Sequence, residues 1–308
     1  MTYSYIGKMA AYERDRQGVS AETVCKGLCD LDIYNSFEKG EDVGDIHVVR
    51  LLLQGLGISA SLAGRYLCRD EYDEMHARFN ILELLRADEL ILAKTAALEY
   101  KNRYCAGSRL NKQFMTYMNA RIAQLDGDSV EALHLYKKAI GYTIEDYGVA
   151  EFTCISVYEY FMLANIARLN AVFENYMEAE KLYERLLAYC HRRNSDHWTM
   201  ACVYPKTVCE MLDINSPDSM GIYERRVWLE ECNAAIKALC DTSRLHYICP
   251  LLRKRHALLE LLGEAPDRQW DGFLEHYEWL RNKYHIKGEL LEWYPYYNLS
   301  LIHISEPT

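Results

Sequence analysis

The chain has 308 residues, a length that suits two domains or one small domain followed by a repeat array. Apolar residues make up 50% of the chain and charged residues 26%, which excludes a disordered protein, and the low counts of 6 Pro and 16 Gly argue against collagen-like and all-β architectures. The formal net charge of −10 disfavours non-specific binding to nucleic acid. Because the chain has no run of 18 apolar residues and no apolar secretory signal in residues 1–17, we expect a cytoplasmic protein with no membrane partner.

The cysteine pattern also indicates a reducing compartment. There are 11 cysteines, an odd number, and none of them forms a Cys-x-x-Cys pair. A zinc site is the alternative at two places: the pair Cys25 and Cys29, and the group Cys190, His191, His197 and Cys202. Neither has the spacing of a known zinc site, so packing of small apolar side chains is favoured, and no metal or cofactor is predicted.

The first 60 residues predict a cluster of short helices. An opening helix is expected over residues 4–16, and Ser20 can cap a second helix that runs to about Leu28. After a tight turn, a third helix ends near Glu38, and a closing helix follows over residues 47–56. Two short helices joined by a tight turn within such a cluster are the plan of the helix-turn-helix. Its predicted core consists of Val19, Val24, Leu28, Tyr34 and Phe37.

Beyond residue 60 the apolar residues recur at three- and four-residue spacing, which predicts helices throughout. Two segments about 45 residues apart, 121–140 and 166–186, share a turn, Glu-Ala, a Tyr four residues after the Ala and an apolar residue three further on. Their shared positions are Ala132, Tyr136, Ala139 and Ala179, Tyr183, Leu186, and Ala93 and Ala97 hold similar places. A small residue lets paired helices approach closely, and the Tyr then fills the groove toward the next pair. The segments resemble tetratricopeptide repeats, although their period is longer.

The head is similar to the Xre/Cro phage-repressor type of helix-turn-helix. The matching residues are Val19-Ser20, Val24-Cys25, the Gly27–Cys29 turn, Phe37-Glu38-x-Gly40 and the Leu-rich helix that ends at Leu56-Gly57-Ile58. Together with the repeats, the chain to about Asn298 resembles the peptide-responsive (Rgg/PlcR-like) regulators of clostridia and related bacteria. This resemblance implies an all-α protein with a helix-turn-helix domain over 1–60 and an α-solenoid of helical hairpins over 66–299. It also implies a DNA-binding transcription regulator of the quorum-sensing kind, which acts as a homodimer.

Possible contacts to double-stranded DNA in the head are Ser20, Lys26, Asn35, Ser36 and Lys39, joined by Arg50 if its side chain points outward. The head departs from the family, whose recognition helix presents Ser/Thr, Gln and Arg, because the corresponding stretch 30–36 reads DLDIYNS. Residues 1–60 hold 6 basic and 9 acidic residues, whereas phosphate contacts need cations or donors. Asp32 would face phosphates unfavourably, although a carboxylate can accept from cytosine N4. The alternative is therefore a degenerate head on a protein-interaction scaffold that no longer binds DNA.

The helical array carries the second predicted site. A solenoid has a concave face that suits an extended peptide or a partner helix. The resemblance implies that a signalling peptide in this groove changes the array or the dimer geometry, and with it the spacing of the two heads. Polar or aromatic residues on the first helices of repeats are the candidates: Tyr117, Asn119, Asn165, Tyr204 and Lys206. The alternative for each of them is a contact between helices.

Enzymatic motifs are missing from the sequence. It has no Walker loop, Gly-x-Gly-x-x-Gly, His-Glu-x-x-His or Gly-x-Ser-x-Gly, and its ten histidines are dispersed. The acidic stretch 70–74 is interpreted as a solvated helix start. We therefore expect a protein that is not an enzyme and has no catalytic residues.

The last nine residues, SLIHISEPT at 300–308, look like a translated sequencing adapter rather than native protein. The natural sequence is then expected to depart from this one near Leu299. A natural tail is the alternative.

Overall fold

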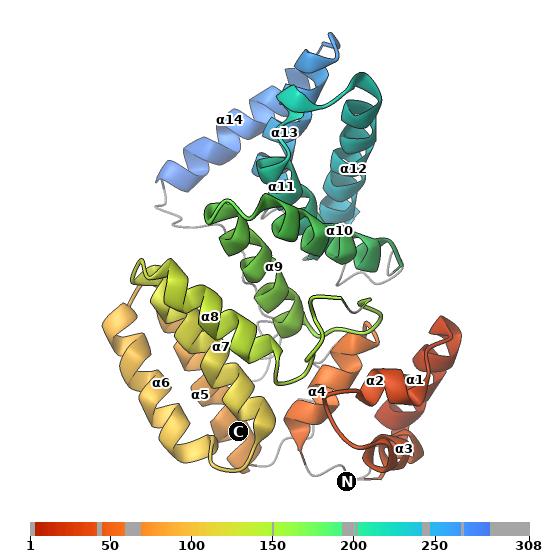
Figure 1. The fold of residues 1–308 in the computed structure, drawn as a ribbon, viewed down its shortest axis with the longest axis vertical. Helices are drawn as coiled ribbons and strands as arrows, with labels where there is room; N and C mark the ends of the chain where they lie inside the picture. The colour runs from red at the N-terminus through yellow and green to blue at the C-terminus, as the bar shows by residue number, and fades with distance from the viewer. Residues whose placement is uncertain are drawn as a thin grey trace, which may run out of the picture. The chain divides into compact units, whose positions relative to one another are not determined.

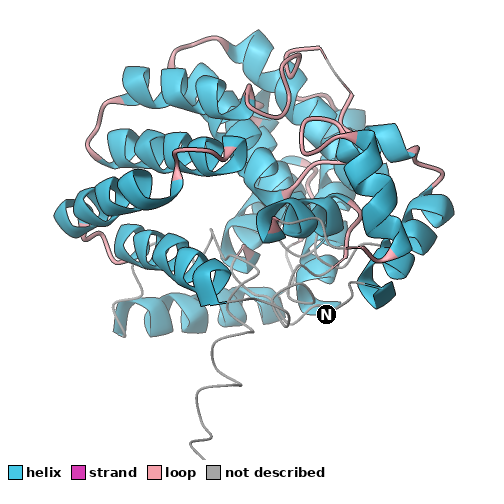
Figure 2. Cartoon of the chain, turned by 90° about the horizontal axis from the view of Figure 1, so that it is seen from below, coloured by secondary structure: helices cyan, strands magenta, loops and turns pink. Residues whose placement is uncertain are grey.

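The structure is a computed structural model that describes residues 4–41, 45–58, 69–149, 151–192, 200, 203–241, 247–265 and 268–283. These residues form fourteen α-helices and a short 3-10 helix, and no β-strand occurs among them (Figures 1 and 2). The all-α prediction is confirmed. His197, Cys202 and the predicted adapter at 300–308 lie outside the described residues.

Contacts divide the chain into two compact units. The described residues up to Asn175 belong to the first unit, and those from Tyr176 onward belong to the second. The first unit thus contains both the predicted head and the first helices of the predicted array. A domain boundary between residues 60 and 66 stays a prediction.

The head consists of four short helices: α1 (Ser4–Gln17), α2 (Ala21–Cys25), α3 (Leu31–Lys39) and α4 (Ile46–Gly55). Side-chain oxygens begin two of them, because Ser20 Oγ accepts from the Thr23 amide at 3.2 Å and Asp45 Oδ1 accepts from the His47 amide at 2.8 Å. Helix α2 is shorter than expected: it ends at Cys25, because Lys26 leaves the helical conformation and Gly27 has a φ of 77°.

The core of the head agrees in part with the prediction. Val24, Tyr34 and Phe37 are buried, as expected, whereas Val19 and Leu28 are only half-buried. Leu28 falls outside any helix because α2 ends early, and it follows the turn rather than a helix face.

Helix α1 crosses α3 at Gly7, where the two backbones approach closely. A Cβ atom on Gly7 would overlap the carbonyl oxygen of Phe37. This close approach lets Ile6 and Ala10 on α1 pack into the same core as Phe37.

The rest of the first unit is a row of successive helices, α5 (Arg69–Arg86), α6 (Leu90–Tyr104), α7 (Arg109–Leu125), α8 (Ser129–Ile140) and α9 (Val157–Val172). Each packs on the next in chain order (Figure 1). The small residues of the repeat pattern are where close packing requires them, because Ala93, Ala97, Ala132 and Ala139 are almost fully buried on α6 and α8.

Tyrosine rings fill the space between these helices. A continuous series of ring contacts, with centroids 5.3 to 6.0 Å apart, runs from Tyr100 through Phe114, Tyr158 and Tyr117 to Tyr136. These rings come from α6, α7, α9 and α8, so the aromatic series joins four helices. Part of the high tyrosine content of the sequence thus serves packing between helices.

The second unit contains α10 (Tyr176–Arg192), α11 (Tyr204–Ile214), α12 (Ile222–Asp241), α13 (Ile248–Leu261) and α14 (Arg268–Lys283). A 3-10 turn over Pro217–Ser219 lies between α11 and α12. Ala179, Tyr183 and Leu186 are buried, and the Tyr183 hydroxyl donates to Glu210 on the following helix at 2.9 Å. The tyrosine of this repeat therefore contacts the next helix, as the pattern predicts. None of the described helices of either unit is both long and apolar enough to span a membrane.

The close approach at Gly7 gives a stability prediction. We expect Gly7→Ala to lower the free energy of unfolding by about 1–3 kcal/mol, because the added methyl group must displace the backbone of α3. Urea denaturation followed by circular dichroism measures this change. The matched control is Gly107→Ala, at a position where a Cβ has open space; an equal effect of the two substitutions would contradict the prediction.

Candidate functional site

The helix-turn-helix of the head is capped where α2 begins and where α3 ends. Ser20 starts α2, and Gly40 ends α3 in the left-handed conformation, with its amide donating to the Phe37 carbonyl at 2.8 Å. The Gly at this position is therefore needed for the backbone geometry that follows the predicted recognition helix.

The predicted DNA contacts lie on both helices of this motif. Ser20, Lys26 and Lys39 are exposed, whereas Asn35 and Ser36 are half-buried on α3. Their role in DNA binding stays a prediction.

Arg50, however, does not point outward. It is 2% exposed, and its Nη1 lies 2.8 Å from the sulfur of Met75 on α5. Arg50 therefore does not join the predicted DNA contacts, because its side chain is packed between α4 and α5.

Arg14, another cation of the head, is paired with a carboxylate of the protein itself. Arg14 on α1 forms a two-pronged ion pair with Glu38 on α3, at 2.6 and 3.0 Å, and this hydrogen-bonded carboxylate raises the pKa of the guanidinium. Arg16 is bound to Glu13 at 2.7 Å. At the start of α3, Asp30 and Asp32 are exposed. The exposed face of α3, the predicted recognition helix, is therefore acidic at its beginning.

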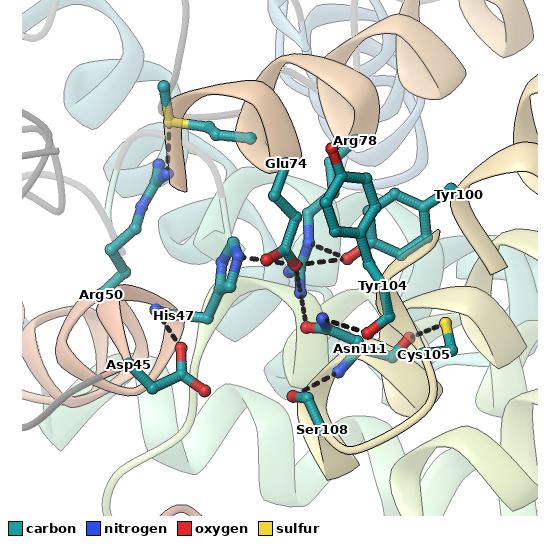
Figure 3. Close-up of polar contacts among 11 residues, drawn as sticks. Asp45, His47, Arg50, Glu74, Arg78, Tyr100, Tyr104, Cys105, Ser108 and Asn111 are labelled. Carbon is teal, nitrogen blue, oxygen red and sulfur yellow. Dashed lines mark hydrogen bonds and ion pairs between the residues drawn. The ribbon is translucent and has the colours of Figure 1, made fainter. Parts of the chain in front are cut away.

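A buried polar cluster joins the head to the helices that follow it (Figure 3). Its members come from four helices: His47 on α4, Glu74 and Arg78 on α5, Tyr100 on α6 and Asn111 on α7. Glu74 Oε1 lies 2.9 Å from His47 Nε2, accepts from the Tyr100 hydroxyl at 2.7 Å and is 3.4 Å from Arg78.

Arg78 is the second centre of this cluster. It donates to the Tyr100 hydroxyl at 2.7 Å and to the Asn111 side chain at 2.6 Å, and its guanidinium lies 4.6 Å from the ring centre of Phe114. The Asn111 amide group in turn donates to the Tyr104 carbonyl at 2.9 Å. These bonds fix α5, α6 and α7 to one another as well as to the head.

The protonation states of the cluster follow from its burial. Burial alone would raise the pKa of the Glu74 carboxyl, but the hydrogen bond with His47 and the charge of Arg78 lower it to about 2. Burial, helped by the positive charge of Arg78, lowers the pKa of His47. At neutral pH the cluster is a Glu74–Arg78 ion pair with a neutral imidazole beside it. Its polar groups bind one another, which makes the cluster a structural joint.

Sequence reasoning missed this joint. The sequence predicts a solvated stretch over 70–74, and Asp70 is indeed exposed, but the Glu74 side chain is only 15% exposed. The interpretation was wrong for Glu74 because α4 and α6 cover it. One signal was available: Glu74 and Arg78 have opposite charges at an i,i+4 spacing, which places them on the same helix face.

The predicted peptide contacts fall in both units. Tyr117 is buried among the rings described above, and Asn119 is exposed on the same helix. Asn165 is 2% exposed; its amide donates to the Phe161 carbonyl at 2.8 Å and its oxygen accepts from Arg168 at 2.7 Å.

The remaining two peptide candidates lie on α11 of the second unit. Tyr204 donates to Glu231 at 2.5 Å, and Lys206 lies 2.6 Å from Glu210. Of the five candidates, Asn119 alone is exposed, and the other four make contacts between or within helices. Their role in peptide binding stays a prediction.

The two cysteines of the head, Cys25 and Cys29, form no disulfide bond. Cys25 is buried, and burial raises the pKa of the Cys29 thiol to about 11. No group of three or more His, Cys, Asp or Glu side chains in the described residues is arranged to hold a metal ion.

Comparison with known proteins supports the architecture. No protein-family model matches the chain, and no curated protein matches its sequence. Among solved structures, the chain is similar to the crystal structure of Bacillus thuringiensis PlcR in complex with the peptide PapR7 and DNA, with a TM-score of 0.52 and 14% sequence identity. The match covers 92% of this chain and 99% of PlcR, so the shared helical fold extends over nearly the whole length of both.

The buried imidazole predicts a loss of stability in acid. The folded-state pKa of His47 is lower than its ordinary value of 6.5, so the unfolded chain binds a proton more readily as the pH falls below that value. The free energy of unfolding should therefore decline with falling pH in this window, while above it the contribution is constant. We expect His47→Gln to flatten the decline in urea titrations between about pH 7 and 5. The control is His134→Gln, at an exposed position; a decline in His47→Gln as steep as in the wild type would contradict the prediction.

Proposed function

We propose that the chain is a DNA-binding transcription regulator, located in the cytoplasm, whose helical array binds a short signalling peptide and mediates dimerisation. The observation that carries this proposal is the similarity over 92% of the chain to PlcR, a protein solved with a peptide and DNA, combined with the capped α2–turn–α3 unit of the head. A regulator of this kind has no catalytic residues.

The arrangement of the head supports a rigid presentation of α3. The Arg14–Glu38 pair joins α1 to α3, and the Gly7 contact brings the same two helices together. A recognition helix must be held firmly so that its first residues reach base edges in the major groove. In this proposal Ser20, Lys26 and Lys39 contact phosphates, and Asn35 and Ser36 read bases.

A second candidate function is a protein-interaction scaffold that has lost DNA binding. Two observations favour it: the start of α3 is acidic, and Arg14 and Arg50 are used inside the protein. Both functions share the helical array, so they differ in the behaviour of the head alone.

DNA binding separates the two functions. The full chain is incubated with a pool of random-sequence duplexes, and bound DNA is selected and measured by mobility shift. We expect selection of a defined sequence, and an affinity about tenfold or more weaker for the double variant Lys26→Ala/Lys39→Ala, because it removes two cations from the phosphate-facing surface. If the wild type selects no DNA, the scaffold function holds. If it binds DNA and the double variant binds equally well, the assignment of the head surface fails.

Peptide binding is tested by calorimetry with a pool of short synthetic peptides. We expect Asn119→Ala, which removes an exposed amide from α7, to weaken binding by about tenfold, since an Asn can bond both groups of a peptide amide. Asn165→Ala should abolish binding, but because its amide is bonded within the unit, its unfolding curve must be recorded alongside. Thr116→Ala, another side-chain change on α7, is the control; undiminished binding by Asn119→Ala would contradict this choice of site.

A further inference from the structure

The acidic head raises the question of which cations could face the phosphates of DNA. Within the head, Arg14 and Arg16 are held by Glu38 and Glu13, and Arg50 is buried. Further exposed cations lie outside the head, on α7, which contacts the turn between α2 and α3.

The turn between α2 and α3 is in direct contact with α7. Arg109, the first residue of α7, donates a hydrogen bond from Nη2 to the carbonyl of Gly27, a residue 82 positions earlier in the chain. The same turn also touches the segment after α8, because a Cβ on Gly27 would overlap the carbonyl oxygen of Thr143. The hydrogen bond places Arg109 at the backbone of Gly27, the residue that follows Lys26, within the same compact unit.

The charge of Arg109 reaches the start of the recognition helix. Burial raises the pKa of the Cys29 thiol, the negative charge of Asp30 raises it further, and the positive charge of Arg109 acts in the opposite direction. Since Cys29 is two residues before α3, Arg109 lies close to the end of α3 that begins with exposed acidic residues.

Lys112 extends this positive surface by one turn of α7. At an i,i+3 spacing, Arg109 and Lys112 share a face of that helix, and both are exposed, as is Lys26. None of these three cations is in an ion pair with another side chain of the described residues, in contrast to Arg14 and Arg16. Their charges are thus available to an anionic partner.

We propose that Arg109 and Lys112, which we call the α7 cations, bind phosphates of the DNA backbone beside the helix-turn-helix, together with Lys26. The DNA surface is then composite: α3 supplies base contacts, and α7 adds positive charge to that of Lys26 and Lys39 in the acidic head. The guanidinium of Arg109 has five N–H donors, so its bond to Gly27 leaves donors for a phosphate. This inference rests on the proposed function, because it assigns phosphate contacts to a DNA-binding protein.

The salt dependence of binding tests the α7 cations. The probe is the duplex selected by the wild type from the random-sequence pool, and a random duplex serves as the non-specific reference. Each phosphate contact contributes about 0.9 to the slope of log affinity against log salt concentration. We expect Arg109→Ala and Lys112→Ala each to reduce that slope by about 0.9, so that the affinity lost between 50 and 200 mM salt becomes about 3.5-fold smaller for each. Both should weaken specific and random duplexes to the same degree.

Two further variants separate charge from packing. Arg109→Lys keeps the charge and should retain the wild-type slope, although it loses the planar fork. Lys94→Ala is the control. It removes an exposed cation near the N-terminal end of α6, away from Arg109 in the sequence, and should leave the slope unchanged. Unfolding curves of all variants confirm that the fold is intact.

The outcomes distinguish this inference from the function on which it rests. Wild-type binding with unchanged slopes in both alanine variants overturns the inference and leaves DNA binding in place. A weaker affinity of Arg109→Ala with an unchanged slope also overturns it, since Arg109 would then act only by holding the turn. If the wild type binds no DNA at all, the proposed function and this inference both fail.

Discussion

The ion pair between Glu74 and Arg78 is the interaction on which the arrangement of the first unit depends. Two buried charges are costly unless each is paired and hydrogen-bonded, and here the partners come from α4, α6 and α7 as well as from α5 itself. Removing either Glu74 or Arg78 would leave the charge of the other buried without its ionic partner. Through His47, the pair links α4 of the head to α5, and contacts group the head with α5–α9 in one unit.

Contacts within the protein also reduce the number of cations that the acidic head presents to solvent. Two arginines of the head bind other parts of the protein and are not available to DNA. Arg14 pairs with Glu38 and so links α1 to α3, and Arg50 packs against α5. A fixed joint lets other helices of the unit contribute charge in a defined position. Arg109, remote in sequence, lies at the helix-turn-helix turn through its hydrogen bond to Gly27, where we propose that it serves the same surface as Lys26.

Packing between helices relies on tyrosine throughout both units. Tyr100, Tyr117 and Tyr136 place rings between neighbouring helices, and the hydroxyls of Tyr100, Tyr136 and Tyr183 each donate to a carboxylate or amide oxygen at 2.7 to 2.9 Å. A phenol thus fills space and satisfies a polar group at once. For the peptide candidates this has a direct consequence: Tyr117 and Tyr204 belong to these contacts, and Asn119 is the one that faces solvent.

Local sequence determined the helices, the caps at Ser20 and Gly40 and the close-packed alanines, because periodicity, capping and small side chains act within a few residues along the chain. It also determined the acidity of the head. Tertiary structure alone decided that Glu74 is buried rather than solvated, that Arg50 points inward and that Arg109 meets Gly27. These outcomes depend on which surfaces of distant helices are brought together, and spacing along a single chain carries no direct record of such contacts.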